Sequence, residues 1–375
     1  MIPPTVDLST LAPMDVAGRL PRLRERLGEA GCDALLVTNL ANVRYLTGFT
    51  GSAALLLVLP DELVLATDGR YQFQSAEQLA AAGVDARIEI GNAAGQRQAL
   101  SASARSVARL GLEAASVTWA RQRAFAAEWF ADAELVATEN VVEDLRRVKD
   151  DGEVARMAAA AAVSDQALAA VRHLLAEGTS EAGFALALDS EIRRLGASGN
   201  SFDTIVASGP NGAKPHARPT DRVVEAGELV VVDFGAVVDG YCSDMTRTLC
   251  VGPPRSAVLE RMVEVVAASQ AAGVAAVRAG RRAVDVDATC REVIAAAGWA
   301  DAFLHSTGHG VGLDIHEAPS VSAVSGDTLA TGYVVTVEPG VYLPDHGGVR
   351  IEDTVVVTED GCRPLTLAPK DLIIQ

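Results

Sequence analysis

Residues 229–248 read LVVVDFGAVVDGYCSDMTRT, and residues 333–354 read YVVTVEPGVYLPDHGGVRIEDT. Each stretch presents an aliphatic strand, a carboxylate with glycine two positions later, a reversal of the chain, and a second strand with a carboxylate-x-Thr sequence. This agreement predicts two copies of one β-hairpin unit within the chain. The carboxylates concerned are Asp233 and Asp244 in the first copy, and Glu338 and Glu352 in the second.

The first copy predicts a definite geometry. Asp239-Gly240 is a strong signal for a two-residue hairpin turn. Pairing outward from this turn, Asp233 faces Thr246, and Asp244 lies two residues along on the same side of the sheet. Carboxylates in the middle of apolar strands are costly to bury without cations. A bulge in either hairpin would change this parity, and the connection YLPDHGG in the second copy is longer.

Glycines surround a histidine in STGHGVGLDIHEAP (306–319). Together with the four carboxylates, His309 completes a ligand set for two metal ions that share bridging oxygens. Its oxygen-rich character favours Mn²⁺, with Co²⁺ or Zn²⁺ as alternatives, over a thiolate-type site. Each residue alone would be read as an ordinary surface or turn residue, and GHGVG lacks the spacing of a nucleotide-binding loop.

The length of 375 residues predicts two domains. The first runs to residue 145 and alternates helix and strand patterns. The second begins with a helix that starts at Asp150 or Asp151 and ends at Gly178. Other predicted helices are 15–31, 72–83, 256–279 and 283–297, and predicted strands are 33–38, 53–59, 62–67 and 85–90.

Composition restricts the partners and the compartment. A net charge of −17 argues against nucleic acid and anionic membranes, which would repel the chain. Neither a signal peptide nor an apolar run of membrane-spanning length is evident. Five cysteines without a pattern fit reduced thiols, so a cytoplasmic location is expected. Cys242 alone is a weak candidate for a nucleophile.

Several motifs together resemble the proline-specific metallopeptidases of the pita-bread fold, which comprise the Xaa-Pro dipeptidases (prolidases) and aminopeptidase P. The resemblance extends to NVRYLTGFTGSAALLLV (42–58), which is similar to the N-terminal domain of that family, and to LRRVKDDGEV (145–154), which is similar to its interdomain junction. The other motifs are PHARP (215–219), VVVDFGAVVDGYCSDMTRT (230–248), STGHGVGLDIHEAP (306–319), TVEPGVY (336–342) and GVRIEDTVVVT (348–358).

The resemblance implies an α/β (α+β) fold. A small creatinase-like α/β domain, residues 1–145, would precede a pita-bread catalytic domain, residues 146–375, with an internal pseudo-twofold duplication. It also implies a dinuclear centre in which Asp244 and Glu352 bridge the metals. The implied metal ligands are Asp233, Asp244, His309, Glu338 and Glu352.

The remaining roles implied by the resemblance concern catalysis and substrate. Glu338 would take the proton of the attacking water, and His216 and His316 would contact the substrate and stabilise the intermediate. Arg350 would either hold the carboxylate end of the substrate or pair with the ligand carboxylates. Arg44, in a loop of the N-terminal domain, could cap the site from a partner subunit. His305 is expected to be structural, and His173 and His346 have no matching role.

The expected activity is hydrolysis of the bond between an N-terminal residue and a following proline. An Xaa-Pro dipeptidase is slightly favoured, with aminopeptidase P acting on longer peptides as the alternative. A metal-free creatinase-like enzyme is disfavoured because all five ligands are present, and methionine aminopeptidase is disfavoured by the N-terminal domain. A non-catalytic binding protein on the same fold is the rival from a different class. The expected partners are Xaa-Pro dipeptides or short peptides with proline second, together with a second copy of the chain in a homodimer.

Overall fold

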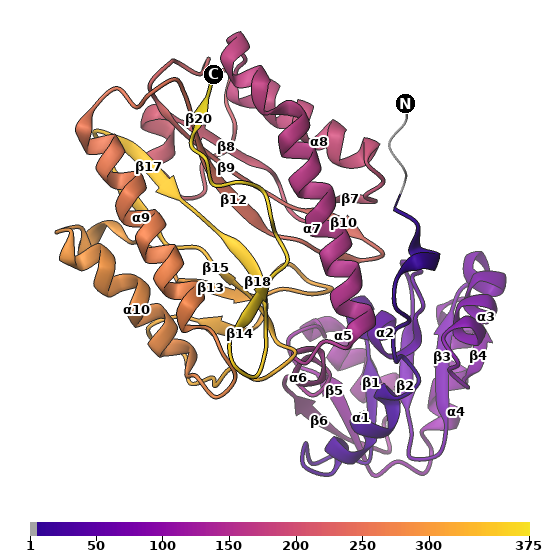
Figure 1. Ribbon diagram of the computed structural model, residues 1–375. Coiled ribbons are helices and arrows are strands. Elements are labelled where there is room, and N and C mark those ends of the chain that lie inside the picture. Colours follow the sequence, from indigo (N-terminus) through magenta and orange to yellow (C-terminus); the bar gives the residue numbers. More distant parts are fainter. Residues whose placement is uncertain (1–5) are drawn as a thin grey trace. The chain divides into compact units, whose positions relative to one another are not determined.

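The computed structural model describes residues 6–375, which form two compact units (Figure 1). One unit runs from Met14 to Arg146. The other runs from Arg147 to Gln375 and includes the described residues before Met14. Each unit has hydrophobic clusters of its own, and each is described separately below.

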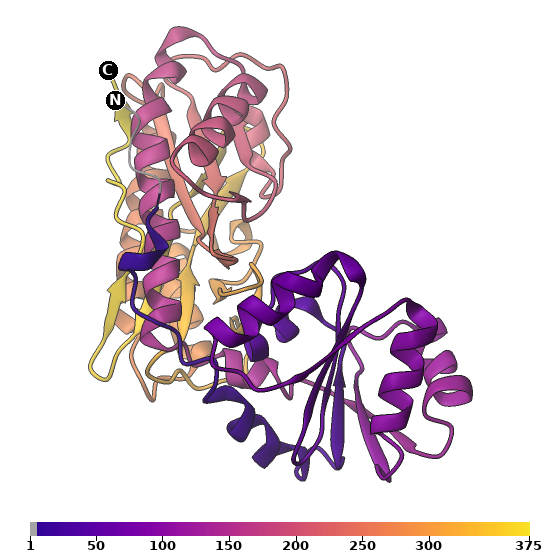
Figure 2. The same cartoon turned by 90° about the vertical axis from the view of Figure 1, so that its right-hand side faces the viewer.

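The first unit is a six-stranded sheet of order β4-β3-β2-β1-β5-β6, with helices on both sides of the sheet (Figure 2). Strands β1 and β5 pair in parallel, and β1 and β2 pair antiparallel. Its strands are β1 (Ala34–Val37), β2 (Leu55–Val58), β3 (Leu63–Thr67), β4 (Arg87–Ile90), β5 (Arg109–Glu113) and β6 (Glu134–Thr138). Its helices are α1 (Arg19–Leu27), α2 (Leu40–Thr47), α3 (Gln72–Ala81), α4 (Ala93–Ser103), α5 (Trp119–Ala124) and α6 (Glu143–Arg146), with a short π-helix at Phe125–Trp129.

Burial explains why the central strands carry aliphatic residues at every position. All residues of β1, β2 and β3 are buried, as expected where helices cover both faces of a sheet. The edge strands β4 and β6 carry exposed and half-buried residues instead. The sequence-based predictions of β1 to β4, α1 and α3 are confirmed within a few residues at each end.

Arg44 lies on helix α2, so its expected position in a loop is wrong. The Asn39 side chain caps this helix by accepting from the Ala41 amide, and Gly48 ends it in the left-handed conformation with φ 74°. Both residues are ordinary helix-boundary signals. The helix has only eight residues, which is too short for its hydrophobic periodicity to predict it.

The second unit begins with α7 (Asp151–Val171), whose N-terminus is a capping box. The Asp150 side chain accepts from the Glu153 amide, and the Glu153 side chain accepts from the Asp150 amide. A 3₁₀ segment, Arg172–Glu177, extends the helix to Gly178, which has φ 77°. The predicted start and end of this helix are confirmed. Its length and composition would also suit a membrane span, but 56% of its most apolar window is buried in the protein.

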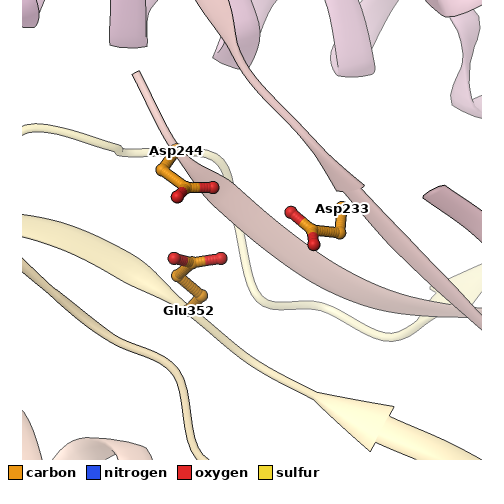
Figure 3. Close-up of side chains that lie close together, drawn as sticks. All are labelled: Asp233, Asp244 and Glu352. Carbon is orange, nitrogen blue, oxygen red and sulfur yellow. The ribbon is translucent and has the colours of Figure 1, made fainter. Parts of the chain in front are cut away.

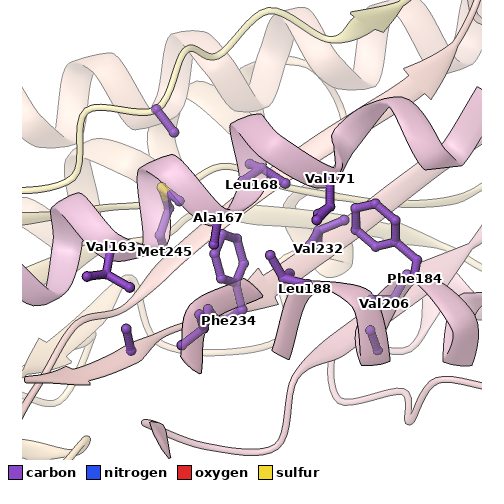
Figure 4. Close-up of a cluster of buried hydrophobic side chains, with 14 of the residues drawn as sticks. Val163, Ala167, Leu168, Val171, Phe184, Leu188, Val206, Val232, Phe234 and Met245 are labelled. Atoms are coloured by element: carbon purple, nitrogen blue, oxygen red, sulfur yellow. The ribbon is translucent and has the colours of Figure 1, made fainter. Parts of the chain in front are cut away.

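The remaining elements form two halves of similar construction. In the first half, α7 and α8 (Glu181–Arg194) pack on a sheet of order β20-β12-β9-β8; in the second, α9 (Ala257–Ala276) and α10 (Ala283–Ala296) pack on a sheet of order β14-β13-β15-β18-β19 (Figure 1). Figure 4 shows the core of the first half, where Phe184 and Leu188 of α8 meet Val232 and Phe234 of β9. The strands are β7 (Gly199–Asn200), β8 (Ile205–Ser208), β9 (Leu229–Phe234), β10 (Ala236–Val238), β11 (Tyr241–Cys242), β12 (Met245–Val251), β13 (Gly308–Gly310), β14 (Glu317–Val321), β15 (Val334–Val337), β16 (Gly340–Leu343), β17 (Gly347–Arg350), β18 (Asp353–Val357), β19 (Cys362–Pro364) and β20 (Ile373–Ile374).

The predicted hairpin of the first half is confirmed. Val238 pairs with Tyr241 across Asp239-Gly240, both of which have positive φ, and Asp233 pairs with Thr246. The ladder is interrupted at Gly235 and continues in the same register, so no residue changes face. A side chain at Gly235 would collide with the Ser243 carbonyl, which explains the glycine two residues after the carboxylate.

The second hairpin behaves in the same way over a longer reversal. Val337 pairs with Asp353 on one side of the interruption, and Gly340 pairs with Arg350 on the other. Continuing this register places Glu338 opposite Glu352. The carboxylates Asp244, Glu338 and Glu352 therefore lie at the points where the two hairpins pass from one sheet to another.

Candidate metal centre and active site

Three carboxylates from both hairpins converge in the second unit. Asp233 stands on β9, Asp244 precedes β12 and Glu352 precedes β18, and their nearest carboxylate oxygens lie within 4.8 Å of one another. Figure 3 shows the three side chains pointing towards one another from separate strands. The predicted convergence of the two hairpins on one point is therefore present in the fold.

His309 joins this carboxylate cluster from β13. Its Nε2 atom lies 3.5 Å from Asp244 Oδ2 and 3.5 Å from Glu338 Oε1. Its Nδ1 atom lies 2.9 Å from the Gly310 carbonyl oxygen, so Nδ1 carries the proton and Nε2 turns a lone pair to the carboxylates. Burial lowers the pKa of His309 to about 4, which keeps the ring neutral at neutral pH.

The glycines beside His309 have a steric explanation. A Cβ atom at Gly308 would collide with the Thr336 carbonyl of β15, and one at Gly310 would collide with the Ala318 carbonyl of β14. His309 therefore reaches the cluster because its strand packs closely between two neighbours.

The charges of the cluster favour a bound cation. Four carboxylates face one guanidinium, that of Arg350, which leaves a formal charge of −3 when all are ionised. Two buried oxygens, Asp233 Oδ1 and Glu352 Oε1, have no hydrogen-bond partner in the described part of the chain. Burial and the neighbouring carboxylates raise the pKa values of Asp244 and Glu352 well above the usual range, and burial raises that of Glu338 to about 8. This donor set fits divalent cations.

Hydroxyl groups orient the carboxylates. Thr246 Oγ1 donates to Glu352 Oε2 at 2.7 Å, and Thr336 Oγ1 donates to Glu338 Oε1 at 3.1 Å. Each hydroxyl fixes one oxygen of its carboxylate, and the Glu338 oxygen fixed in this way is the one that faces His309.

Arg350 is almost fully buried, and its guanidinium makes four hydrogen bonds. Its guanidinium donates to Asp233 Oδ2 at 2.6 Å, to Thr246 Oγ1 at 3.1 Å, to the Tyr342 hydroxyl at 2.7 Å and to the Pro215 carbonyl at 3.2 Å. Of the two roles expected for Arg350, this geometry provides the pairing with a cluster carboxylate.

His305 continues this network away from the cluster. Its Nδ1 lies 2.8 Å from the Ser306 carbonyl, and its Nε2 lies 2.8 Å from the Tyr342 hydroxyl, which also accepts from Arg350. Burial and the charge of Arg350 lower the pKa of His305 to about 4, and burial raises that of Tyr342 to about 12. The neutral phenol and imidazole therefore buttress the guanidinium.

A cavity of about 440 Å³ opens over the cluster and is lined by residues of the second unit. His216 and His316 both stand on its wall with exposed side chains, and the His316 ring centre lies 4.3 Å from that of His309. The lining also includes the apolar residues Phe202, Ile205, Pro215, Pro219 and Ile315.

A buried ion pair holds the turn that carries His316. Lys149 Nζ lies 3.0 Å from Glu317 Oε2, and the two side chains are 1% and 8% exposed. The other Glu317 oxygen accepts from the Asp314 amide at 3.1 Å, which closes the turn from Gly312 to Glu317. Arg44 belongs to the first unit and is not among the residues that line the cavity.

Sequence reasoning missed several supporting residues. Thr246 and Thr354 were visible in the carboxylate-x-Thr pattern but received no role, and Thr354 donates to the Asp244 carbonyl at 2.8 Å. Tyr342 and Lys149 carry no local signal of this kind, because their partners are far away in the sequence.

Comparison with known proteins identifies the class. Residues 155–359 match the family model "Metallopeptidase family M24", and residues 19–148 match "Creatinase/Prolidase N-terminal domain". The chain belongs to metallopeptidase family M24. The predicted α/β pita-bread fold with a creatinase-like N-terminal domain is confirmed, and so is the predicted class of enzyme, a metallopeptidase.

Three relatives show how far the similarity extends. The uncharacterized peptidase YqhT of Bacillus subtilis is 43% identical over 95% of this chain and 99% of its own length. The structure of the Xaa-Pro dipeptidase from Bacillus anthracis has a TM-score of 0.90 at 38% identity, covering 96% of this chain and all of the other. The structure of the X-Pro aminopeptidase from Thermotoga maritima has a TM-score of 0.86 at 32% identity, covering 95% of this chain and all of the other.

Proposed function

We propose that this chain hydrolyses the bond between an N-terminal residue and a following proline. The observation that carries the proposal is the convergence of Asp233, Asp244, Glu338, Glu352 and His309 beneath one cavity. The names of the two solved relatives support the same substrate class. An Xaa-Pro dipeptidase is favoured, and aminopeptidase P activity on longer peptides is the alternative.

The five cluster residues would hold two divalent ions, with Asp244 and Glu352 shared between them. Mn²⁺ is proposed first, because carboxylates outnumber imidazoles four to one among these residues; Co²⁺ and Zn²⁺ suit the same donors. Two such ions, when bound, supply a water nucleophile at neutral pH and polarise the substrate carbonyl.

Residues of the chain itself then transfer the proton of the water and stabilise the substrate's carbonyl oxygen. Glu338 accepts the proton of the attacking water and returns it to the departing proline nitrogen, while Thr336 holds its carboxylate in place. His316 and His216, on the cavity wall, donate hydrogen bonds to the oxygen that gains negative charge. Arg350 orients the Asp233 carboxylate.

Proline selectivity follows from what the site does not need to provide. The imide nitrogen of an Xaa-Pro bond has no hydrogen to donate, so no acceptor is required for it. A pyrrolidine ring instead needs an apolar surface, which Phe202, Ile205 and Ile315 offer on the cavity wall.

Three further features are proposed. The chain acts as a homodimer in which Arg44 caps the site of the partner subunit. It works in the cytoplasm, with reduced cysteines, and it binds neither nucleic acid nor membranes. Arg44→Ala tests the first point, because an unchanged activity on dipeptides would remove the proposed cap.

The substrate class is tested by proline release from Ala-Pro beside cleavage of Ala-Pro-Ala, with Mn²⁺-loaded enzyme and a chelated control. Chelator-sensitive cleavage of Ala-Pro alone is the result expected for a dipeptidase. Equal or faster cleavage of Ala-Pro-Ala would assign aminopeptidase P activity. Failure to cleave either peptide, with metal bound, would refute the Xaa-Pro proposal and favour a binding protein.

The Lys149–Glu317 ion pair gives a prediction about positioning. Lys149→Met leaves the Glu317 carboxylate buried without its partner, which costs about 3–5 kcal/mol and loosens the turn before His316. We expect kcat for Ala-Pro to fall at least about ten-fold with a smaller change in KM, measured by steady-state kinetics. The double variant Lys149→Met with Glu317→Gln recovers stability without recovering kcat. A single variant with normal kcat would show that the pair does not position His316.

A further inference from the structure

The proposed dipeptidase activity leaves one chemical requirement unassigned. An Xaa-Pro dipeptide places a free carboxylate directly after the proline ring, at the side of the cavity away from the scissile bond. The chain carries a net charge of −17, and four of its carboxylates lie in the cluster beneath the same cavity. An anionic substrate group therefore needs a local cation that the cluster does not already use.

Two arginines stand among the described residues that line the cavity: Arg218 and Arg350. Arg350 is 3% exposed, and its guanidinium already serves Asp233, Thr246, Tyr342 and the Pro215 carbonyl. A substrate carboxylate could recruit it only by displacing a buried partner. Arg350 is therefore committed to the cluster.

The lining histidines are no better suited to this task. His305 is engaged on both ring nitrogens by a backbone carbonyl and a tyrosine hydroxyl, and His309 faces the cluster carboxylates. His316 and His216 are assigned to the scissile carbonyl in the proposed mechanism. Arg218 is the permanent cation that remains.

Arg218 pairs with Asp203 in a contact that a substrate carboxylate can replace. Its Nη1 atom lies 2.8 Å from Asp203 Oδ2, and the two side chains are 83% and 82% exposed. Exposed pairs of this kind contribute little, so a substrate carboxylate can compete with Asp203. Pro219 follows Arg218 directly and Pro215 lies three residues earlier, which restricts the backbone of the segment that carries it.

We propose that Arg218 is a specificity-determining residue that binds the carboxylate of the proline residue, and that the substrate displaces Asp203 from its guanidinium. This inference rests on the proposed Xaa-Pro activity. In this role Arg218 selects dipeptides over longer peptides. Arginine suits the task because its planar guanidinium can donate two parallel hydrogen bonds to one carboxylate.

The test compares Ala-Pro with Ala-Pro-NH₂, which differ only in the carboxylate. Steady-state kinetics are measured on Mn²⁺-loaded wild type, Arg218→Gln, Arg218→Lys and Asp203→Asn. Arg194→Gln is the matched control, because Arg194 is a half-exposed arginine paired with Glu191 outside the cavity lining.

We expect Arg218→Gln to raise KM for Ala-Pro about ten-fold, in line with a charge-assisted pair, and to leave KM for Ala-Pro-NH₂ within about two-fold. Arg218→Lys should retain most of the preference. Asp203→Asn should lower KM for Ala-Pro about two-fold, because it removes the competing carboxylate. Arg194→Gln should change neither substrate.

Equal effects of Arg218→Gln on the acid and the amide, or no effect on either, would overturn the inference while Xaa-Pro activity stands. A rise in KM for Ala-Pro alone in Asp203→Asn would also overturn it. If the wild type cleaves neither compound with metal bound, the proposed function fails, and this inference fails with it.

Discussion

Asp244→Asn should abolish proline release from Ala-Pro and reduce the metal content from about two ions per chain to one or fewer. Asp244 lies within reach of Asp233, Glu352 and His309. The change to Asn therefore removes a negatively charged ligand from between these three residues. Two ions contribute several kcal/mol to transition-state stabilisation, so the loss should be on the order of a thousand-fold or more.

The control for this variant is Asp345→Asn, an exposed carboxylate in the turn between β16 and β17. It should leave both the metal content, measured by elemental analysis, and the activity unchanged. Thermal unfolding separates misfolding from lost chemistry: in chelator, Asp244→Asn should be at least as stable as wild type, because it relieves repulsion among buried carboxylates. An active variant with two bound ions would contradict the assigned role of Asp244.

Removing metal should make the stability of the protein strongly dependent on pH. The folded-state pKa of Glu338 is raised to about 8, and those of Asp244 and Glu352 are also raised above their unfolded values. Groups of this kind contribute stability that is complete below the unfolded pKa, near 4, and is lost as pH rises through the folded pKa. The chelated protein should therefore lose stability between pH 6 and 8.5.

The expected loss in free energy of unfolding is on the order of 3 kcal/mol, or roughly 10 °C in Tm, measured by differential scanning fluorimetry in chelator. Metal-loaded protein should change little over the same range, because bound cations keep the carboxylates ionised. His305 and His309 have folded-state pKa values lowered to about 4, so they add stability until pH has passed their unfolded pKa near 6.5, and they oppose the loss only at the acidic end of this window. Glu338→Gln should flatten the profile of the chelated protein. An equally flat profile for the chelated wild type would contradict the burial of uncompensated carboxylates.

Much of the fold and of the site was predictable from local patterns. The register that pairs Asp233 with Thr246 follows from the Asp239-Gly240 turn, and the start of α7 follows from Asp150. The duplication of strand, carboxylate and glycine indicated that a second hairpin would deliver Glu338 and Glu352 to the same place. These features depend on periods and turns of a few residues.

The supporting contacts were not predictable, because they join residues that are distant in the sequence. Thr246 donates to Glu352, 106 residues later, and Lys149 pairs with Glu317, 168 residues later. The residues adjacent to Thr246 and Lys149 in the sequence do not indicate which distant carboxylate each side chain contacts. Asp203 and Arg218 likewise meet only because the loops before β8 and β9 fold over the same cavity.

The two hairpins and β13 are expected to form a dinuclear metal site together. The most direct measurement is anomalous diffraction at the manganese absorption edge from crystals of the Mn²⁺-loaded protein. We expect two peaks enclosed by Asp233, Asp244, His309, Glu338 and Glu352, and at most one peak in crystals of Asp244→Asn. Wild-type crystals with no peak at these residues, or with metal bound elsewhere while the enzyme releases proline, would contradict it.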